Sequence, residues 1–197
     1  MQKQMPPMSR VRRLLCLAAL SLPLWPLAPA LAALPVGAAA PDFTTEAALA
    51  GKAFKFNLAE TLKKGPVVLY FYPKAFTSGC TLEAHQFAEA TEQFEKLGAT
   101  VIGISNDSIE TLKKFSVEAC RNKFAVAADA GAKVMKDYDA KLMLMPGTAD
   151  RISYLISSEA RIVALHASLN AEGHVAAMLK ATQALAASKD KATPNKP

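Results

Sequence analysis

A cysteine at position 80 carries the clearest chemical signal in the sequence. It follows Thr77, Ser78 and Gly79, and it comes directly before a helical pattern of apolar residues. This order predicts a thiol in the first turn of a helix. The first N–H groups of a helix have no internal partner and the peptide dipoles favour negative charge there, so we expect this thiol to ionise readily. The thiolate is the reactive form, which makes Cys80 a candidate nucleophile.

Two neighbours stand where they could assist such a thiol. Thr77, one turn before Cys80, could bring a hydroxyl to the sulfur, and Glu83, one turn after it, could anchor an arginine or cap the helix. The alternative interpretation is structural, because a free cysteine also packs as a small apolar side chain. The position alone leaves both interpretations open.

The elements that must position Cys80 are two strands and the helix between them. Residues 67–72 form an apolar and aromatic run without polar alternation, typical of a strand covered on both faces, and Pro73 ends it. A helix is predicted from about Ser78, with an apolar stripe that continues to Leu97. Residues 100–105 form a second buried strand, so the three elements predict a right-handed βαβ unit.

The remaining pattern predicts an α/β protein with a thioredoxin-like fold, in which helices flank a central mixed β-sheet. Asp107 and Glu110 resemble a capping box at the start of the next helix. Strands 152–156 and 162–165 are joined by a short polar connection, which predicts an antiparallel hairpin. The other predicted elements are strands 53–57 and 124–128 and helices 58–64, 132–138 and 172–187. The predicted domain spans 33–187, with a disordered tail at 188–197.

The first 32 residues have the pattern of a cleaved signal peptide. Arg10, Arg12 and Arg13 precede the apolar stretch 14–31, which ends in small residues at the predicted cleavage site. Three prolines interrupt the stretch, so a membrane anchor is the second interpretation. Cleavage predicts a periplasmic or secreted protein without stable membrane association. It also removes four basic residues and no acidic one, leaving 19 Lys and Arg against 17 Asp and Glu. No basic cluster remains, so we expect no nucleic-acid partner.

The segment from Pro73 to Cys80 resembles the peroxiredoxin active-site signature P-x-x-x-T-x-x-C. It has the form found in the bacterioferritin comigratory protein, or Q-type, group of the AhpC/TSA superfamily. Residues 40–43 and 150–156 resemble two further segments of that family, and the resemblance covers about residues 36–185. It implies an enzyme, a thiol-dependent peroxidase that reduces hydrogen peroxide and organic hydroperoxides without a metal or another cofactor.

The resemblance also implies roles for individual residues. Cys80 matches the peroxidatic cysteine, whose thiolate attacks the hydroperoxide and becomes a sulfenic acid. Arg151 matches the arginine that stabilises the thiolate and orients the peroxide. Thr77 matches the hydroxyl that hydrogen-bonds peroxide and sulfur, and Pro73 matches the residue that shields the site from water.

Cys120 is the second cysteine beyond the predicted signal peptide. An even pair in an exported protein fits either a structural disulfide or a redox couple. The resemblance favours the couple, in which Cys120 resolves the Cys80 sulfenic acid and a thioredoxin- or glutaredoxin-like reductant regenerates both thiols. A one-cysteine enzyme that uses an external thiol is the alternative. We expect a monomer or a weak dimer.

A second class of function is a copper-binding protein of the same fold. Met143 and Met145 would present two thioethers on one face of an extended segment, with Cys80 and His85 as companions, since soft ligands select Cu(I). Copper titration followed by thiol protection would distinguish binding from catalysis. The sequence predicts no catalytic role for His166 or His174.

Overall fold

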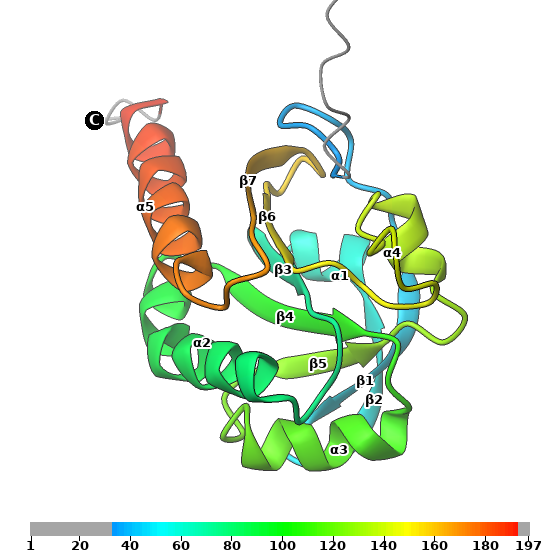
Figure 1. The fold of residues 1–197 in the computed structure, drawn as a ribbon. Coiled ribbons are helices and arrows are strands. Elements are labelled where there is room, and N and C mark those ends of the chain that lie inside the picture. Colours follow the sequence, from blue (N-terminus) through cyan, green and yellow to red (C-terminus); the bar gives the residue numbers. More distant parts are fainter. Residues whose placement is uncertain (1–32, 193–197) are drawn as a thin grey trace, which may run out of the picture. The chain divides into compact units, whose positions relative to one another are not determined.

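The computed structural model describes residues 33–192, which form a seven-stranded sheet with helices on both faces (Figure 1). The strand order is β2-β1-β5-β4-β3-β6-β7. The strands are β1 (Thr44–Leu49), β2 (Lys52–Asn57), β3 (Val67–Phe71), β4 (Thr100–Ser105), β5 (Ala125–Ala128), β6 (Ile152–Ile156) and β7 (Ile162–Ala167). The helices are α1 (Leu58–Leu62), α2 (Ser78–Lys96), α3 (Ile109–Glu118), α4 (Lys133–Asp137) and α5 (His174–Ala192).

The sheet is mixed, as predicted. Strands β3, β4 and β5 pair in parallel, whereas β6 and β7 continue the sheet in antiparallel pairs. The β3–α2–β4 unit that carries Cys80 and the β6–β7 hairpin both form where the sequence indicated. The thioredoxin-like α/β fold class is therefore confirmed.

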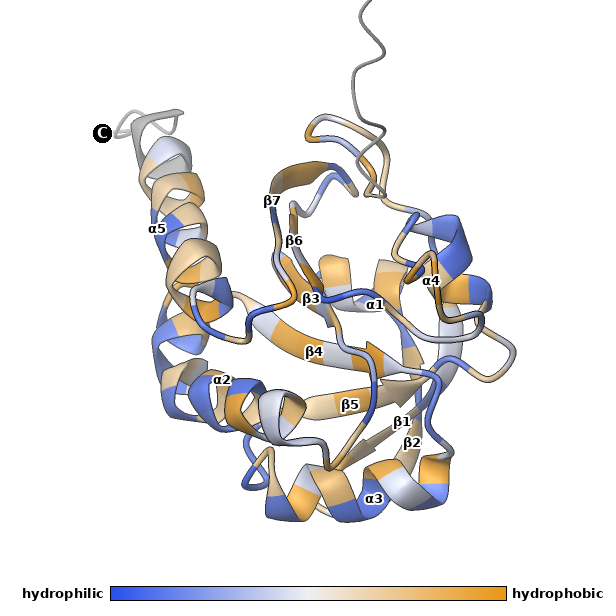
Figure 2. Ribbon diagram, viewed as in Figure 1, coloured by the Kyte–Doolittle hydropathy of each residue, from blue (hydrophilic) through white to orange (hydrophobic). Residues whose placement is uncertain are grey.

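Alternating side chains of β3 divide the core into two layers. Val67, Leu69 and Phe71 face the layer that includes residues of α1 and α4. Val68 and Tyr70 face the layer that includes residues of α2, α3 and α5. Figure 2 shows apolar residues on the strands and polar residues on the outer sides of the helices. Burying each large apolar side chain contributes roughly 1.5–3 kcal/mol, so the second layer holds α2 firmly against the sheet.

Strand β1 was not predicted, although it pairs with β2 on one side and β5 on the other. Its sequence, TTEAAL, contains no aromatic or β-branched residue after Thr45. Ala47 and Ala48 are completely buried, so contacts with the rest of the sheet stabilise a strand that local propensity does not favour.

Several predicted helix boundaries are wrong, including the end of α1 at Leu62 and the start of α5 at His174. Helix α3 begins after Ser108, whose hydroxyl accepts a hydrogen bond from the Thr111 N–H, and Asp107 is turned away to another partner. Helix α5 continues to Ala192, beyond the predicted end at residue 187. The rest of the predicted tail, 193–197, and the predicted signal peptide, 1–32, lie outside the described residues. In the described part of the chain, no helix has the length and apolar character needed to cross a membrane.

Candidate active site

Cys80 lies in the first turn of α2, as predicted, and its side chain is only 1% exposed. The loop that leads to it is attached to the turn after β4. The Ala75 N–H donates to Asp107 Oδ2 at 2.7 Å, and the Ser105 hydroxyl donates to the same oxygen at 2.8 Å. Asp107 therefore fixes the loop instead of capping α3, a role that the sequence did not reveal.

Phe76 provides a second attachment for this loop. Its backbone has a φ of 65°, in the left-handed region that bulky residues rarely adopt. Its ring meets Phe115 of α3 edge-on, with ring centroids 5.2 Å apart. The packing against α3 stabilises the strained residue and links the active-site loop to that helix.

Arg151 lies directly before β6 and brings its guanidinium to Cys80. Its Nη2 donates to Cys80 Sγ at 3.5 Å, and its Nε donates to the Leu169 carbonyl at 3.0 Å. A side chain at Gly79 would crowd this approach, because a Cβ there would lie 3.2 Å from Nη2. The fold thus brings together Cys80 and Arg151, two of the residues singled out in the sequence.

Glu83 binds the other end of the guanidinium. Its Oε2 accepts a hydrogen bond from Arg151 Nη1, and both side chains are buried. Of the two roles that the sequence allowed for Glu83, the structure shows the anchoring of an arginine. Burial raises the pKa of Glu83 to about 7, even though Arg151 acts to lower it. Burial acts to lower the pKa of Arg151, but the neighbouring Glu83 and Cys80 outweigh this effect and raise it.

Thr77 and Pro73 lie at the edge of the site. Thr77 is the N-cap residue of α2, and its hydroxyl donates to the Lys74 carbonyl at 3.0 Å. Pro73 is half-buried between the end of β3 and the loop. Both residues are close to Cys80 along the chain, but the structure places the Thr77 hydroxyl on a backbone carbonyl of the loop and not on the sulfur.

Cys120 lies just beyond α3, and both it and Cys80 are buried free thiols. Burial raises the pKa of Cys120 well above its usual range. Both thiols lie near the phenols of Tyr70 and Tyr72, whose pKa values are raised well above their usual range chiefly by burial, with smaller contributions from the two cysteines. The Tyr70 ring stacks on Phe87 at 4.4 Å between centroids, so aromatic side chains fill this part of the core.

The sequence missed the contribution of His174 and Ser153. Both are completely buried, with His174 Nδ1 2.8 Å from Ser153 Oγ and 3.6 Å from Glu83 Oε1. The signal that could have revealed His174 is helical spacing, because it precedes the buried residues Met178 and Thr182 by one and two turns.

The copper-binding prediction loses its structural basis. Met143 lies in a turn and Met145 in the bend that follows, not in the extended segment that would align their thioethers, and both side chains are exposed. His85 is half-exposed on α2. Among the residues described here, no group of three or more His, Cys, Asp or Glu side chains could hold a metal ion.

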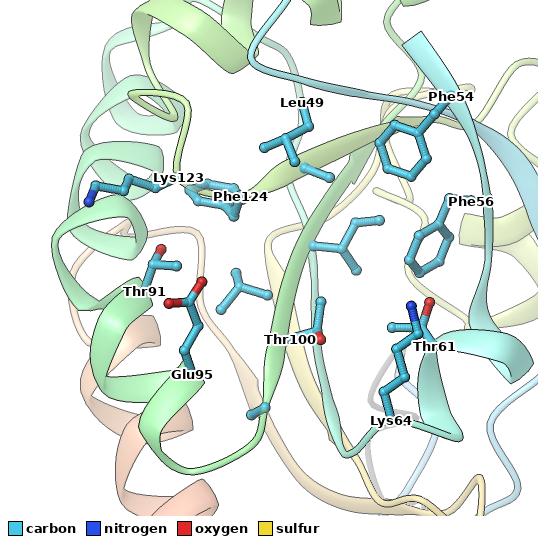
Figure 3. Close-up of a pocket in the computed structure, with 14 residues that line it drawn as sticks. Leu49, Phe54, Phe56, Thr61, Lys64, Thr91, Glu95, Thr100, Lys123 and Phe124 are labelled. Carbon is cyan, nitrogen blue, oxygen red and sulfur yellow. The ribbon is translucent and has the colours of Figure 1, made fainter. Parts of the chain in front are cut away.

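The structure also contains a hollow of about 300 Å³, whose lining residues are drawn in Figure 3. Its wall includes Phe54 and Phe56 of β2 and Glu95 of α2, together with Lys123 and Phe124, which follow Cys120. Neither Cys80 nor Arg151 lines it, so the hollow is separate from the candidate active site.

Comparison with known proteins identifies the family. The AhpC/TSA family model matches residues 36–165, most of the predicted domain. The chain belongs to the AhpC/TSA family. This AhpC/TSA protein is 34% identical over 152 residues to the peroxiredoxin bcp of Helicobacter pylori strain J99, covering 75% of this chain and 97% of that one. It is 33% identical over 150 residues to the chloroplastic peroxiredoxin Q of Oryza sativa subsp. japonica, covering 76% and 67%.

A solved structure supports the same relationship. The crystal structure of the peroxidoxin BcpB from Mycobacterium tuberculosis matches with a TM-score of 0.70 and 27% identity, covering 77% of this chain and 98% of that one. The family and the fold together make the protein a peroxiredoxin, a thiol-dependent peroxidase, as the active-site motif predicted.

Proposed function

We propose that Cys80 is the peroxidatic thiol of an exported peroxidase and that Cys120 resolves its sulfenic acid. The observation that carries this proposal is the 3.5 Å contact between Arg151 Nη2 and Cys80 Sγ in the first turn of a helix. A permanent positive charge and free helix N–H groups at one sulfur favour the thiolate.

The first step forms a bond between Cys80 Sγ and the terminal oxygen of the hydroperoxide while the O–O bond breaks. The leaving oxygen takes a proton and departs as water or an alcohol, and the sulfur becomes a sulfenic acid. Arg151 stabilises the negative charge that moves from the sulfur to the leaving oxygen. The Thr77 hydroxyl turns from Lys74 to the bound peroxide, and Pro73 keeps water from the sulfur.

In the second step, the Cys120 sulfur attacks the Cys80 sulfenic acid, which forms a disulfide and releases water. A disulfide needs Cα atoms about 4.4–6.8 Å apart, so both buried thiols must leave their present packing. On the Cys80 side, the first turn of α2 has no side-chain cap and no acidic residue to stabilise it. This turn therefore lacks two contributions that would oppose its unwinding.

The segment after Cys120 is also suited to local opening. Arg121 and Asn122 both have left-handed backbones, with φ values of 50° and 60°. The exposed ion pairs Arg121–Glu89 and Lys123–Glu92 hold the segment on α2. Exposed pairs contribute little to stability, so these contacts restrain the segment only weakly.

Mass analysis of the reduced protein, from residue 33 onward, after one equivalent of hydrogen peroxide tests these roles. We expect loss of two hydrogens in the wild-type protein, no oxidation in Cys80→Ser, and one added oxygen in Cys120→Ser. A Cys120 thiol that stays free while Cys80 is oxidised would overturn the resolving role and leave a one-cysteine peroxidase. Normal peroxide consumption by Cys80→Ser would overturn the assignment of the peroxidatic thiol.

The partners and location follow from the same proposal. The disulfide is reduced by two thiols of a thioredoxin- or glutaredoxin-like protein, delivered into an oxidising compartment. The apolar pattern of 14–31 supports export to the periplasm or beyond, and the protein acts as a monomer or weak dimer. Fractionation of cells, with mass analysis of the exported form, tests cleavage after residue 32. Sedimentation of that form tests the oligomeric state.

A further inference from the structure

The second oxygen of Glu83 is the feature that the peroxidase mechanism leaves unused. Glu83 is completely buried, and its Oε2 binds Arg151. Its Oε1 has no hydrogen-bond partner within residues 33–192. A buried carboxylate oxygen without a donor is costly, so its protonation needs an explanation. His174 Nδ1 lies 3.6 Å from this oxygen.

Hydrogen bonds define the tautomer of His174. Its Nε2 lies 2.9 Å from the Ser168 carbonyl oxygen, which can only accept, so Nε2 carries the ring proton in the neutral imidazole. Nδ1 is then an acceptor, and the Ser153 hydroxyl donates to it at 2.8 Å. An ionised Glu83 would place a negative oxygen beside this lone pair. A protonated Glu83 would instead point its O–H toward an acceptor.

We propose that Glu83 carries a proton beside the imidazole of His174, and that this proton determines how much of the Arg151 charge is available to the Cys80 thiolate. While the proton is present, Glu83 is neutral and the positive charge of Arg151 stabilises the Cys80 thiolate. Once it is lost, Glu83 competes with the sulfur for the same charge. His174 is thus a positioning residue that acts through Glu83 and never touches the peroxide.

The surroundings agree with a single proton held on Glu83. Burial raises the pKa of Glu83 to about 7 and lowers the pKa of His174 to about 4, so the carboxyl is the site of the proton near neutral pH. The ionisable groups that face the pair come from α2, β3, the residue before β6, and β7. They are Cys80, Tyr70, Arg151 and His166, and the His166 ring meets the His174 ring edge-on at 4.6 Å between centroids. Arg151 is the permanent charge among them.

The test measures the rate of Cys80 alkylation by iodoacetamide against pH, with Cys120→Ser as the background. Glu83→Gln keeps the shape of the carboxyl but stays neutral, so we expect the midpoint of the profile to move about one pH unit lower. His174→Phe removes the electron-rich ring nitrogen that opposes ionisation of Glu83, so we expect a move of about half a unit higher. In the Glu83→Gln protein, His174→Phe should change nothing. His85→Phe, a matched substitution on α2, should leave the midpoint unchanged.

Ser153→Ala should shift the alkylation midpoint by a smaller amount than His174→Phe, and in the opposite direction. Without the serine donor, Nδ1 is free for the Glu83 proton, so the alkylation midpoint should move lower. In the wild-type protein, the nitrogen chemical shifts of His174 should report Nε2 protonation throughout and change with a midpoint near the Glu83 pKa of about 7. This change should be absent from Glu83→Gln.

Two results would overturn the proposal that His174 acts on Cys80 through a proton on Glu83. One is a His174→Phe substitution that shifts the midpoint equally in the wild-type and Glu83→Gln backgrounds, which indicates that the ring acts only through packing. The other is a set of His174 chemical shifts that stays constant across the pH range in which Glu83 titrates. The proposal rests on Cys80 as the reacting thiol, but alkylation needs no peroxide. Failure of the peroxidase assignment would therefore appear in the mass analysis and not in these profiles.

Discussion

Two substitutions of Arg151 test separately the contributions of its positive charge and of its hydrogen-bond geometry. In Arg151→Lys the charge remains, but one nitrogen replaces the three that bind Cys80, Glu83 and the Leu169 carbonyl. A hydrogen bond to a charged group contributes about 2 kcal/mol, so losing the contact with the sulfur should slow Cys80 oxidation about 30-fold. In Arg151→Gln the charge is lost as well.

The magnitude for the second variant follows from the distance. Two unit charges 3.5 Å apart interact by about 5 kcal/mol at an effective dielectric constant of about 20. Arg151 is only 5% exposed, so solvent screens this interaction little. Allowing for the polar amide that remains, about 4 kcal/mol is lost, and Cys80 oxidation should slow about 1000-fold.

The assay is the second-order rate of Cys80 oxidation by hydrogen peroxide, measured by stopped flow with Cys120→Ser as the background. Urea unfolding of each variant checks the fold. We expect Arg151→Gln to stay folded, because a Glu83 carboxyl with a pKa already raised to about 7 can take up a proton. A rate for Arg151→Gln within about fivefold of the parent, in a folded protein, would refute this account of the site.

Three further outcomes are expected. Gly79→Ala places a Cβ 3.2 Å from the guanidinium, and we expect about fivefold slower oxidation of the thiol with little change in urea stability; an unchanged rate would mean that the arginine adapts freely. Between about pH 4.5 and 6.5, the free energy of unfolding should fall with rising pH in His174→Phe. In Glu83→Gln it should rise over the same range. The reason is that the folded pKa of Glu83 is raised from 4.5 to about 7 and that of His174 is lowered from 6.5 to about 4, so the two slopes oppose each other in the wild type. Urea titrations at several pH values measure these slopes, and parallel curves for the two variants would contradict them. Lys123→Ala removes the exposed pair with Glu92, and disulfide formation after peroxide should become about twofold faster at low salt and unchanged at high salt, as followed by quenched mass analysis.

The reactive end of the site was predictable because its signals are local. An unbroken apolar run, a proline and a helical stripe identify β3, the loop and α2, and they place Cys80 in the first helical turn. Each signal depends on residues within a few positions of one another. The position of Arg151 came from the resemblance to a family, since it is 71 residues from Cys80 along the chain.

Only the tertiary structure decided which polar groups surround Cys80 and Arg151. Asp107 has the sequence pattern of a helix cap, yet packing of the loop makes it a partner of Ala75, 32 residues away. Strand β1 forms from a segment of weak strand propensity because the sheet supplies partners on both sides.

His174 is the clearest example of a contact that local sequence patterns do not reveal. Nothing near it in the sequence indicates a role at Cys80, and its partners Ser153 and Glu83 lie on β6 and α2. The packing of α5 brings the ring to the carboxyl. The sequence by itself determined the candidate nucleophile and the elements that present it, because periodicity and turn chemistry are local. The surroundings of Arg151 depended on contacts between distant segments, which only the folded chain specifies.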